Sequence, residues 1–233
     1  MRDKLRSITQ RLRPPTLCAL CQQYHRGSLA VCIPCHELFL PLGPACKQCA
    51  QPLPDARFLI CGRCCKKKPS FDHTFTGYVF KEPLRTLLHA FKYQEGLYLR
   101  TFFGNLILKA LTIEAKKTEC LIPVPMHRQR LQHRGFNQSA ELVKHLGHQL
   151  KIPYDLFCCK KIINTIPQAG LDAHQRQQNL RHSFAVSPLP YQHVTIVDDL
   201  MTTGSTSHEL AKTLKKQGVS RVDVWCCARV LGD

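Results

Sequence analysis

The chain has 233 residues, 44% of them hydrophobic, and a formal net charge of +17 at pH 7. This apolar content excludes wholesale disorder, and the length allows one large core with a small additional module, so we expect two domains. No apolar run reaches the roughly 20 residues that span a bilayer, and the basic segment 1–16 lacks the apolar region of a signal peptide. We therefore expect a soluble protein.

The positive charge is spread along the whole chain. Residues 1–70 hold 12 basic and 3 acidic side chains, and residues 71–233 hold 21 and 13. An excess of this size favours nucleic acid or phosphorylated ligands as partners over an acidic protein alone. A generally basic surface without a specific polyanion remains the alternative, because charge by itself predicts partners loosely.

Eight of the 14 cysteines form four CxxC pairs near the start of the chain. Each pair can point two sulfurs at one tetrahedral Zn²⁺, and two pairs complete a closed structural site. The segments 17–44 and 45–70 repeat one unit, which predicts two consecutive zinc ribbons with two structural zinc ions. Interleaved pairing is also compatible with the spacing, and redox chemistry by a single pair is the weaker interpretation. The predicted ligands are Cys18, Cys21, Cys32, Cys35, Cys46, Cys49, Cys61 and Cys64.

Paired cysteines that bind metal are typical of a reducing compartment, so we expect a cytoplasmic protein. A basic link of Lys66, Lys67 and Lys68 before Pro69 marks the expected boundary between a double zinc-ribbon domain, 17–70, and an α/β domain, 71–233. The three lysines are candidate contacts to DNA or pyrophosphate.

The first part of the α/β domain predicts a strand over 75–80 and a helix that begins at Pro83. Lys92 lies near the end of this helix; the pattern slightly favours a solvated face, and the alternative is contact with a bound phosphate. A second helix over 97–111 and a buried strand over 120–124 follow.

Residues 125–139, PMHRQRLQHRGFNQS, contain five Arg or His side chains and no acidic one. We predict a loop at the end of the strand that neutralises pyrophosphate or a nucleic-acid backbone. Phe136 could stack on a base, although packing in the following helix, 137–150, is the favoured interpretation. The candidate contacts are Arg128, Arg130, Arg134, Asn137 and Gln138.

After a strand near 156–163, the polar segment 165–184 predicts a mobile flap that carries Arg176 and Arg181 as further candidate contacts to DNA or pyrophosphate. A solvated connector is an equally good interpretation of so long a loop.

Residues 193–206, HVTIVDDLMTTGST, combine an apolar strand, two aspartates and a loop rich in hydroxyls and glycine. A helix over 206–218 and a last strand around 222–226 follow. A turn of this kind at the carboxyl end of a strand binds phosphorylated ligands through backbone N–H groups. A structural strand end or a receiver-type acidic pocket is the alternative, but neither needs the hydroxyl run.

The stretch VDDLMTTGST resembles the phosphoribosyl-pyrophosphate (PRPP) loop of type I phosphoribosyltransferases. Together with the CxxC pairs, HRGFNQS and the pattern PQ...R..NL, nearly the whole chain resembles the ComF/GntX family of competence-associated proteins. The resemblance implies an α/β fold: zinc ribbons before a type I phosphoribosyltransferase-like domain, a parallel sheet flanked by helices. It also implies a role in DNA uptake during natural transformation, with single-stranded DNA as partner. A helicase or translocase could hold the protein at the inner face of the membrane.

In this interpretation Asp198 and Asp199 hold the ribose hydroxyls, and Mg²⁺ bridges pyrophosphate and sugar. The two aspartates are also the catalytic candidates if the protein is an enzyme. The predicted PRPP contacts are Asp198, Asp199, Thr202, Thr203, Gly204, Ser205, Thr206 and Lys92.

Three functions fit these observations. We favour a competence-associated protein that binds single-stranded DNA through basic surfaces and a PRPP-type ligand at the loop. The second is an active phosphoribosyltransferase with Mg²⁺-dependent transfer to an unknown acceptor, and the third is a zinc-stabilised PRPP sensor and scaffold.

Overall fold

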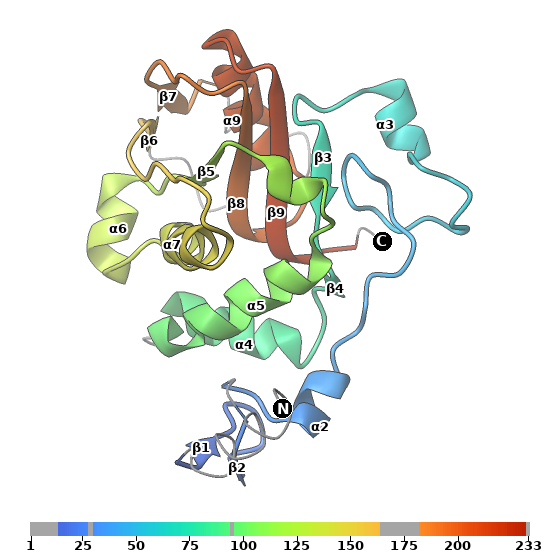
Figure 1. The fold of residues 1–233 in the computed structure, drawn as a ribbon, viewed down its shortest axis with the longest axis vertical. Coiled ribbons are helices and arrows are strands. Elements are labelled where there is room, and N and C mark those ends of the chain that lie inside the picture. Colours follow the sequence, from blue (N-terminus) through green and yellow to red (C-terminus); the bar gives the residue numbers. More distant parts are fainter. Residues whose placement is uncertain (1–13, 28–29, 94–95, 164–181, 232–233) are drawn as a thin grey trace, which may run out of the picture.

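The structure is a computed structural model that describes residues 14–27, 30–93, 96–163 and 182–231 (Figure 1). A parallel five-stranded sheet forms its centre, as the sequence predicts. Across the sheet the strands are β3 (His73–Phe75), β9 (Arg221–Arg229), β8 (His193–Met201) and β5 (Cys120–Pro123), with β4 (Tyr78–Val79) also pairing with β9.

Helices cover both faces of this sheet (Figure 1). The alternation of side chains along β9 explains the layering: Val224 and Cys226 join the core under α9, whereas Trp225 and Cys227 join the core on the opposite face. The helices are α4 (Leu84–Tyr93), α5 (Arg100–Ala110) and α7 (Gln138–Leu150) on one face and α9 (Ser205–Lys216) on the other, with 3₁₀ turns at Gly96–Leu99 and Ala115–Lys117. No described helix is long and apolar enough to cross a bilayer.

The prediction of a basic loop over residues 125–139 is only partly correct, because residues Arg128–Arg134 form the helix α6. The side chain of His127 accepts a hydrogen bond from the backbone N–H of Gln129, and Gly135 ends the helix at a φ of +82°. Most residues between these two caps are good helix formers, so the charge pattern concealed a helix.

A small antiparallel ribbon of β6 (Cys159–Lys161) and β7 (Phe184–Val186) lies apart from the main sheet. Most of the predicted flap, with Arg176 and Arg181, lies outside the described residues.

The two cysteine-rich segments pack on different parts of the α/β fold (Figure 1). The first lies below α4 and α5, where the ring of Phe39 is 5.9 Å from that of Phe102. The second lies at the β3 edge, where the backbone carbonyl of Lys47 accepts a hydrogen bond from Thr74. The described elements of these segments are β1 (Thr16–Leu17), β2 (Tyr24–His25), α2 (Ile33–Glu37) and α3 (Gly62–Lys66).

Candidate functional site

The acidic pair lies near the carboxyl end of β8, which continues beyond it to Met201. The side chain of Asp199 is 8% exposed, and its Oδ2 lies 2.8 Å from Nζ of Lys92 at the end of α4. The solvated position favoured for Lys92 is therefore wrong. Periodicity identified the apolar face of α4 but could not show that the helix ends beside β8.

Asp198 is held in place by its neighbours. Its Oδ1 accepts hydrogen bonds from Oγ of Ser139, at 3.1 Å, and from the backbone N–H of Asp199, at 2.9 Å. Burial and the adjacent Asp199 carboxylate raise the pKa of Asp198 to about 7, against the opposing effect of Lys92. Near neutral pH the pair thus carries less than its full negative charge, and a cation in the site would favour the ionised form.

A cavity of about 330 Å³, here called the acidic-pair cavity, opens in front of Asp198 and Asp199. Cationic side chains from three elements line this cavity together with the two carboxylates: Lys92 from α4, Arg130 and Arg134 from α6, and Lys161 from β6. A neighbouring cavity of about 780 Å³ shares Lys92, Arg130 and Arg134. The arrangement can accommodate a ligand that is both polyanionic and able to bind a divalent cation through the acidic pair.

The structure brings together only part of the predicted site. The predicted residues that line the acidic-pair cavity are Lys92, Arg130, Arg134, Asn137, Gln138, Asp198, Asp199, Thr202 and Thr206. Those that line a second cavity, on the other side of the loop, are Thr203, Gly204, Ser205, Lys67 and Lys68. Arg128 and Lys66 are exposed and line neither of the two cavities.

Asn137 and Gln138 also support the wall of the cavity. Asn137 donates to the backbone carbonyl of Val124 and accepts from the N–H of Ser139, which fixes the start of α7 beside β5. Gln138 donates to the carbonyl of Lys92 and accepts from Arg134 at 3.0 Å.

Besides the apolar Val124, Pro125, Met126 and Leu200, four lining residues of the cavity were not among the predicted site residues: Tyr93, His127, Ser139 and Lys161. Ser139 stood inside the HRGFNQS stretch and was passed over for its charged neighbours. The guanidinium of Arg134 lies 4.7 Å above the ring of Tyr93, a contact between distant segments. Burial and then Arg130 lower the pKa of Lys161 to about 8, with Asp198 opposing the shift.

The loop after β8 makes a tight turn at Gly204, whose φ of +80° is a left-handed conformation. A Cβ there would stand 3.4 Å from the ring of Phe71, so the turn fits closely on the core. The hydroxyls of Thr203 and Ser205 are joined by a hydrogen bond of 2.8 Å. These contacts preform the loop, with its backbone N–H groups at the start of α9.

The eight CxxC cysteines gather into two groups of four, with all sulfurs in each group within 4.8 Å of one another. Zn–S bonds of about 2.3 Å in a tetrahedron place sulfurs about 3.8 Å apart. The sulfurs of Cys21 and Cys32 are 3.8 Å apart, and those of Cys49 and Cys61 are 3.6 Å apart. Both groups therefore fit zinc, and the pairing is consecutive. The first cysteine group is Cys18, Cys21, Cys32 and Cys35, and the second cysteine group is Cys46, Cys49, Cys61 and Cys64.

The crowded thiols cannot all ionise without a cation. Although burial opposes it, hydrogen bonds from the backbone of Cys21 and Cys32 lower the pKa of Cys18 to about 6. Burial and the neighbouring sulfurs raise the pKa of Cys35 to about 12. A divalent ion would compensate the mutual repulsion of four thiolates, as structural zinc sites require.

Arg229 joins the second cysteine group to the loop after β8. Its side chain is buried, and its Nε donates to the carbonyl of Cys49 at 2.9 Å. Its Nη1 donates to the carbonyls of Met201 and Thr202. One guanidinium thus holds the backbone of Cys49 and the loop after β8 together.

Two groups of curated relatives match most of the chain. Competence protein F of Haemophilus influenzae is 36% identical over 178 residues, covering 72% of this chain and 78% of the relative. DNA utilization protein YhgH of Escherichia coli strain K12 is 32% identical over 228 residues, covering 94% of this chain and all of the relative. No protein-family model matches the chain.

Among solved structures, a glutamine PRPP amidotransferase from B. subtilis is similar over 54% of this chain, with 21% identity and a TM-score of 0.37. The allosteric regulatory enzyme of purine biosynthesis is similar over 55% of this chain, with 18% identity and a TM-score of 0.34. The chain spans about a quarter of the length of each of these proteins.

Proposed function

This chain belongs to the ComF family of competence and DNA utilization proteins, and from that premise we propose that it handles single-stranded DNA during uptake. A PRPP-type ligand binds at residues 198–206 in this proposal. The observation that carries it is the acidic-pair cavity, in which two carboxylates, a preformed phosphate loop and four cationic side chains converge.

The chemistry of the cavity supports this choice of ligand. Asp198 and Asp199 would hold the ribose hydroxyls and Mg²⁺. Mg²⁺ is a hard cation that prefers oxygen ligands such as carboxylates. Thr202 and Thr206, on the cavity side of the loop, would contact the 5′-phosphate, while Arg130 and Arg134 would neutralise the pyrophosphate.

A second candidate, an active phosphoribosyltransferase, is favoured by the same combination of carboxylates, hydroxyls and cations in one cavity. Transfer through a cationic sugar would be stabilised by the adjacent Asp198 and Asp199 carboxylates, and departing pyrophosphate by Arg130, Arg134 and Lys161. The acceptor is then a nucleophile that enters through the neighbouring cavity of about 780 Å³.

Calorimetry with PRPP and Mg²⁺, with and without single-stranded DNA, tests the first proposal. We expect PRPP to bind with Mg²⁺, and Asp198→Asn to remove binding. Asp55→Asn is the matched control, because Asp55 pairs with exposed Arg57 and neither residue lines the acidic-pair cavity. Failure of the wild-type chain to bind PRPP would contradict the ligand assignment.

Release of pyrophosphate separates the two candidates. A binding protein holds PRPP without turnover, whereas a transferase releases pyrophosphate when its acceptor is present and loses this activity in Asp198→Asn. Turnover with an identified acceptor would make the second candidate the function of the site.

The remaining expectations belong to the same proposal. The double zinc-ribbon domain, 17–70, and the transferase-like domain, 71–233, would work as one unit in the cytoplasm. A helicase or translocase would pass the incoming strand to it at the inner face of the membrane. The names of the competence and DNA utilization relatives support a role in DNA uptake.

A further inference from the structure

Two cavities adjoin along the junction between the second cysteine-rich segment and the α/β fold, here called the ribbon seam. The first, of about 210 Å³, is lined by Arg63, Lys67 and Lys68 opposite the outer side of the loop after β8. The second, of about 450 Å³, is lined by Lys47, Leu59 and Lys68 among others. Lys68 lines both cavities, so they adjoin at this residue.

The seam carries a strong excess of positive charge. Within the described residues, no carboxylate pairs with Lys47 or Lys67, and the side chain of Arg63 interacts with Cys49 of the second cysteine group. Asp72 is the one acidic side chain among the residues that line the two cavities; it lies 2.8 Å from Nζ of Lys215, outside the seam, and 4.0 Å from Nζ of Lys68. The seam therefore attracts an extended anion.

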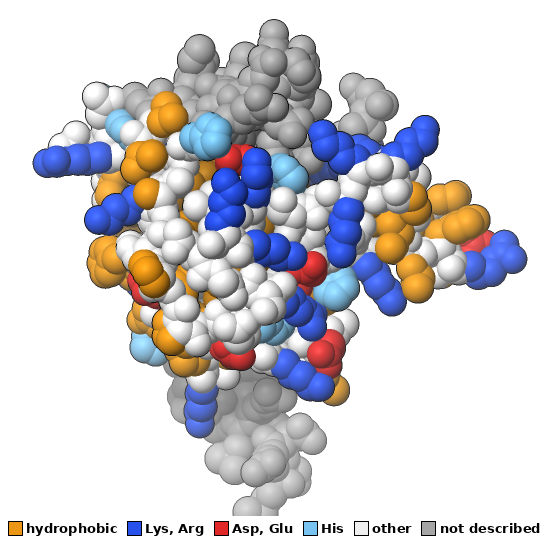
Figure 2. Space-filling model, turned by 90° about the horizontal axis from the view of Figure 1, so that it is seen from above, with side chains coloured by type: hydrophobic (Ala, Val, Ile, Leu, Met, Phe, Trp, Pro, Cys, Tyr) orange, Lys and Arg blue, Asp and Glu red, His pale blue; other side chains and the backbone are white. Residues whose placement is uncertain are grey.

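Leu59 and Ile60 line the second cavity together with Lys47 and Lys68, and Phe58 precedes them in the chain. Phe58, Leu59 and Ile60 are 57%, 53% and 43% exposed, although such residues are usually buried. The backbone carbonyl of Leu59 accepts a hydrogen bond of 2.9 Å from the N–H of Lys47, which fixes this segment next to a cation. Figure 2 shows hydrophobic side chains beside Lys and Arg on the part of the molecule that projects to the right.

From this combination we infer that the ribbon seam is a binding track for single-stranded DNA, distinct from the acidic-pair cavity. Lys47, Arg63, Lys67 and Lys68 contact successive phosphates, and Phe58 stacks on an unpaired base. The inference rests on the proposed function, because it says where the strand binds. A purely protein partner would not require four cations along two adjoining cavities.

The track is tested by fluorescence anisotropy with zinc-loaded full-length chain and labelled oligothymidine, over a series of salt concentrations. Lys67→Gln/Lys68→Gln should weaken binding and reduce the slope of log K against log salt by about 1.4, since each phosphate contact on a single strand contributes about 0.7. Lys66→Gln is the matched control, because Lys66 is exposed and lines neither seam cavity. Lys66→Gln should change the slope by less than about 0.7, the contribution of one phosphate contact.

Phe58→Ala tests base stacking separately. It should weaken binding of oligothymidine about tenfold and leave binding of an abasic strand unchanged. Phe157→Ala is the matched control, since Phe157 is 78% exposed and lies outside the seam. Zinc content and thermal stability of each variant verify folding.

The outcomes are distinguishable. If the wild-type chain binds DNA and the seam variants bind as tightly as their controls, the track is overturned while the proposed function stands; the exposed segment 58–60 would then belong to a protein partner. If the wild-type chain does not bind oligothymidine even at low salt, the DNA function itself is overturned, and the track with it.

Discussion

Lys92 and Asp199, 107 positions apart in the chain, form an ion pair of 2.8 Å at the floor of the acidic-pair cavity. Although its burial opposes the shift, the Asp199 carboxylate raises the pKa of Lys92, so the lysine remains charged at neutral pH. The pair places a fixed cation beside the carboxylates that are proposed to hold Mg²⁺. The same ion pair therefore stabilises the packing of α4 against β8 and sets the charge of the site.

Asp199→Asn should destabilise the folded chain by roughly 3 kcal/mol, because it leaves the Lys92 ammonium largely buried without its partner. Lys92→Met/Asp199→Asn should recover most of this loss, since it removes both charges. Both variants should lose PRPP binding. Chemical denaturation gives the stabilities, and calorimetry gives the binding.

The control for this cycle is Lys144→Met. Lys144 pairs with Glu141 at 2.6 Å, but its side chain is 41% exposed, so its loss should cost less than about 1 kcal/mol. An equal loss of stability in Asp199→Asn and Lys144→Met would contradict the importance of the Lys92–Asp199 pair.

The pKa of Asp198, about 7, predicts opposite effects of pH on stability and binding. Because this value lies above the unfolded pKa of about 3.9, the folded chain holds an extra proton between these limits. The contribution of protonated Asp198 to stability is present below the unfolded pKa and is lost as pH rises through 7. Affinity for PRPP with Mg²⁺ should instead increase with pH up to about 7, by at most tenfold per pH unit, because Mg²⁺ needs the carboxylate.

Calorimetry at pH 6 and pH 8 measures this effect, with buffers of different ionisation enthalpy to count the protons released. Binding should release close to one proton per ligand at pH 6 and less at pH 8. Equal affinity and no proton release at pH 6 would show that Asp198 is already ionised in the free chain.

The sequence predicted those parts of the fold and of the site whose residues follow one another in the chain. The strand, acidic pair, loop and helix from His193 to Gly218 follow one another in the chain, so periodicity and residue type were enough to place them. The consecutive pairing of the cysteines was favoured for the same reason, and the two groups confirm it.

The remainder depends on contacts between distant segments. Lys161 lies on β6, where Lys160 is exposed, and no pattern in the sequence could show which of the two faces Asp198. Arg229 and Cys49 are 180 positions apart, so their hydrogen bond could not be inferred from spacing. The cations of α6 were identified, but their helix was not, because residue charge was given more weight than helix propensity.

The two zinc sites should differ in their effect on the ligand. Cys61→Ser disrupts the second cysteine group, whose Cys49 backbone is held by Arg229 together with the carbonyl of Thr202 in the loop. This variant should lose one zinc ion and bind PRPP at least about fivefold more weakly, a coupling of ordinary size. Elemental analysis and calorimetry measure the two effects.

Cys21→Ser provides the comparison, because the first cysteine group packs below α4 and α5, and no hydrogen bond or ion pair among the described residues joins it to the loop. It should also lose one zinc ion but keep the wild-type affinity for PRPP. The same loss of affinity in both variants would point to general destabilisation instead of coupling through Arg229.

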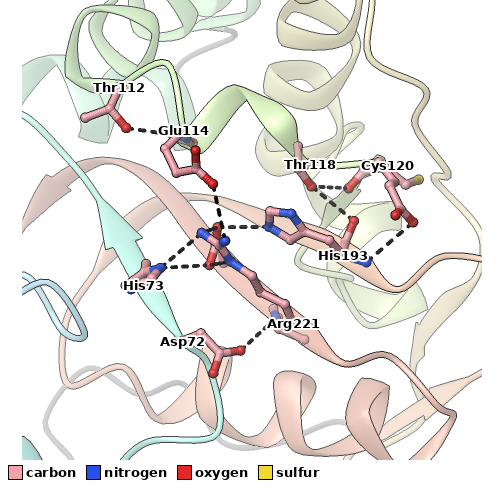
Figure 3. Close-up of polar contacts among 12 residues, drawn as sticks. Asp72, His73, Thr112, Glu114, Thr118, Cys120, His193 and Arg221 are labelled. Carbon is pink, nitrogen blue, oxygen red and sulfur yellow. Dashed lines mark hydrogen bonds and ion pairs between the residues drawn. The ribbon is translucent and has the colours of Figure 1, made fainter.

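A second polar network, at the opposite end of the sheet, should contribute to stability without affecting the ligand. Figure 3 shows His73, His193 and Arg221 converging from three strands. They surround Asp223, which is fully buried, with Nε2 of His193 and Nη2 of Arg221 each 2.9 Å from its Oδ2. Although burial opposes the shift, these partners lower the pKa of Asp223.

Because its pKa is lowered in the folded chain, the Asp223 carboxylate stabilises the fold above its unfolded pKa of about 3.9, and this contribution is lost only as pH falls through the folded value. Asp223→Asn should therefore destabilise the chain at pH 7 by roughly 3 kcal/mol, since His73, His193 and Arg221 lose their carboxylate partner. Glu114→Gln is the control: its side chain is 58% exposed and 3.8 Å from Arg221, so its cost should be below about 1 kcal/mol. Urea denaturation measures both. A loss of PRPP affinity in Asp223→Asn, without a loss of stability, would contradict the separation of this network from the acidic-pair cavity.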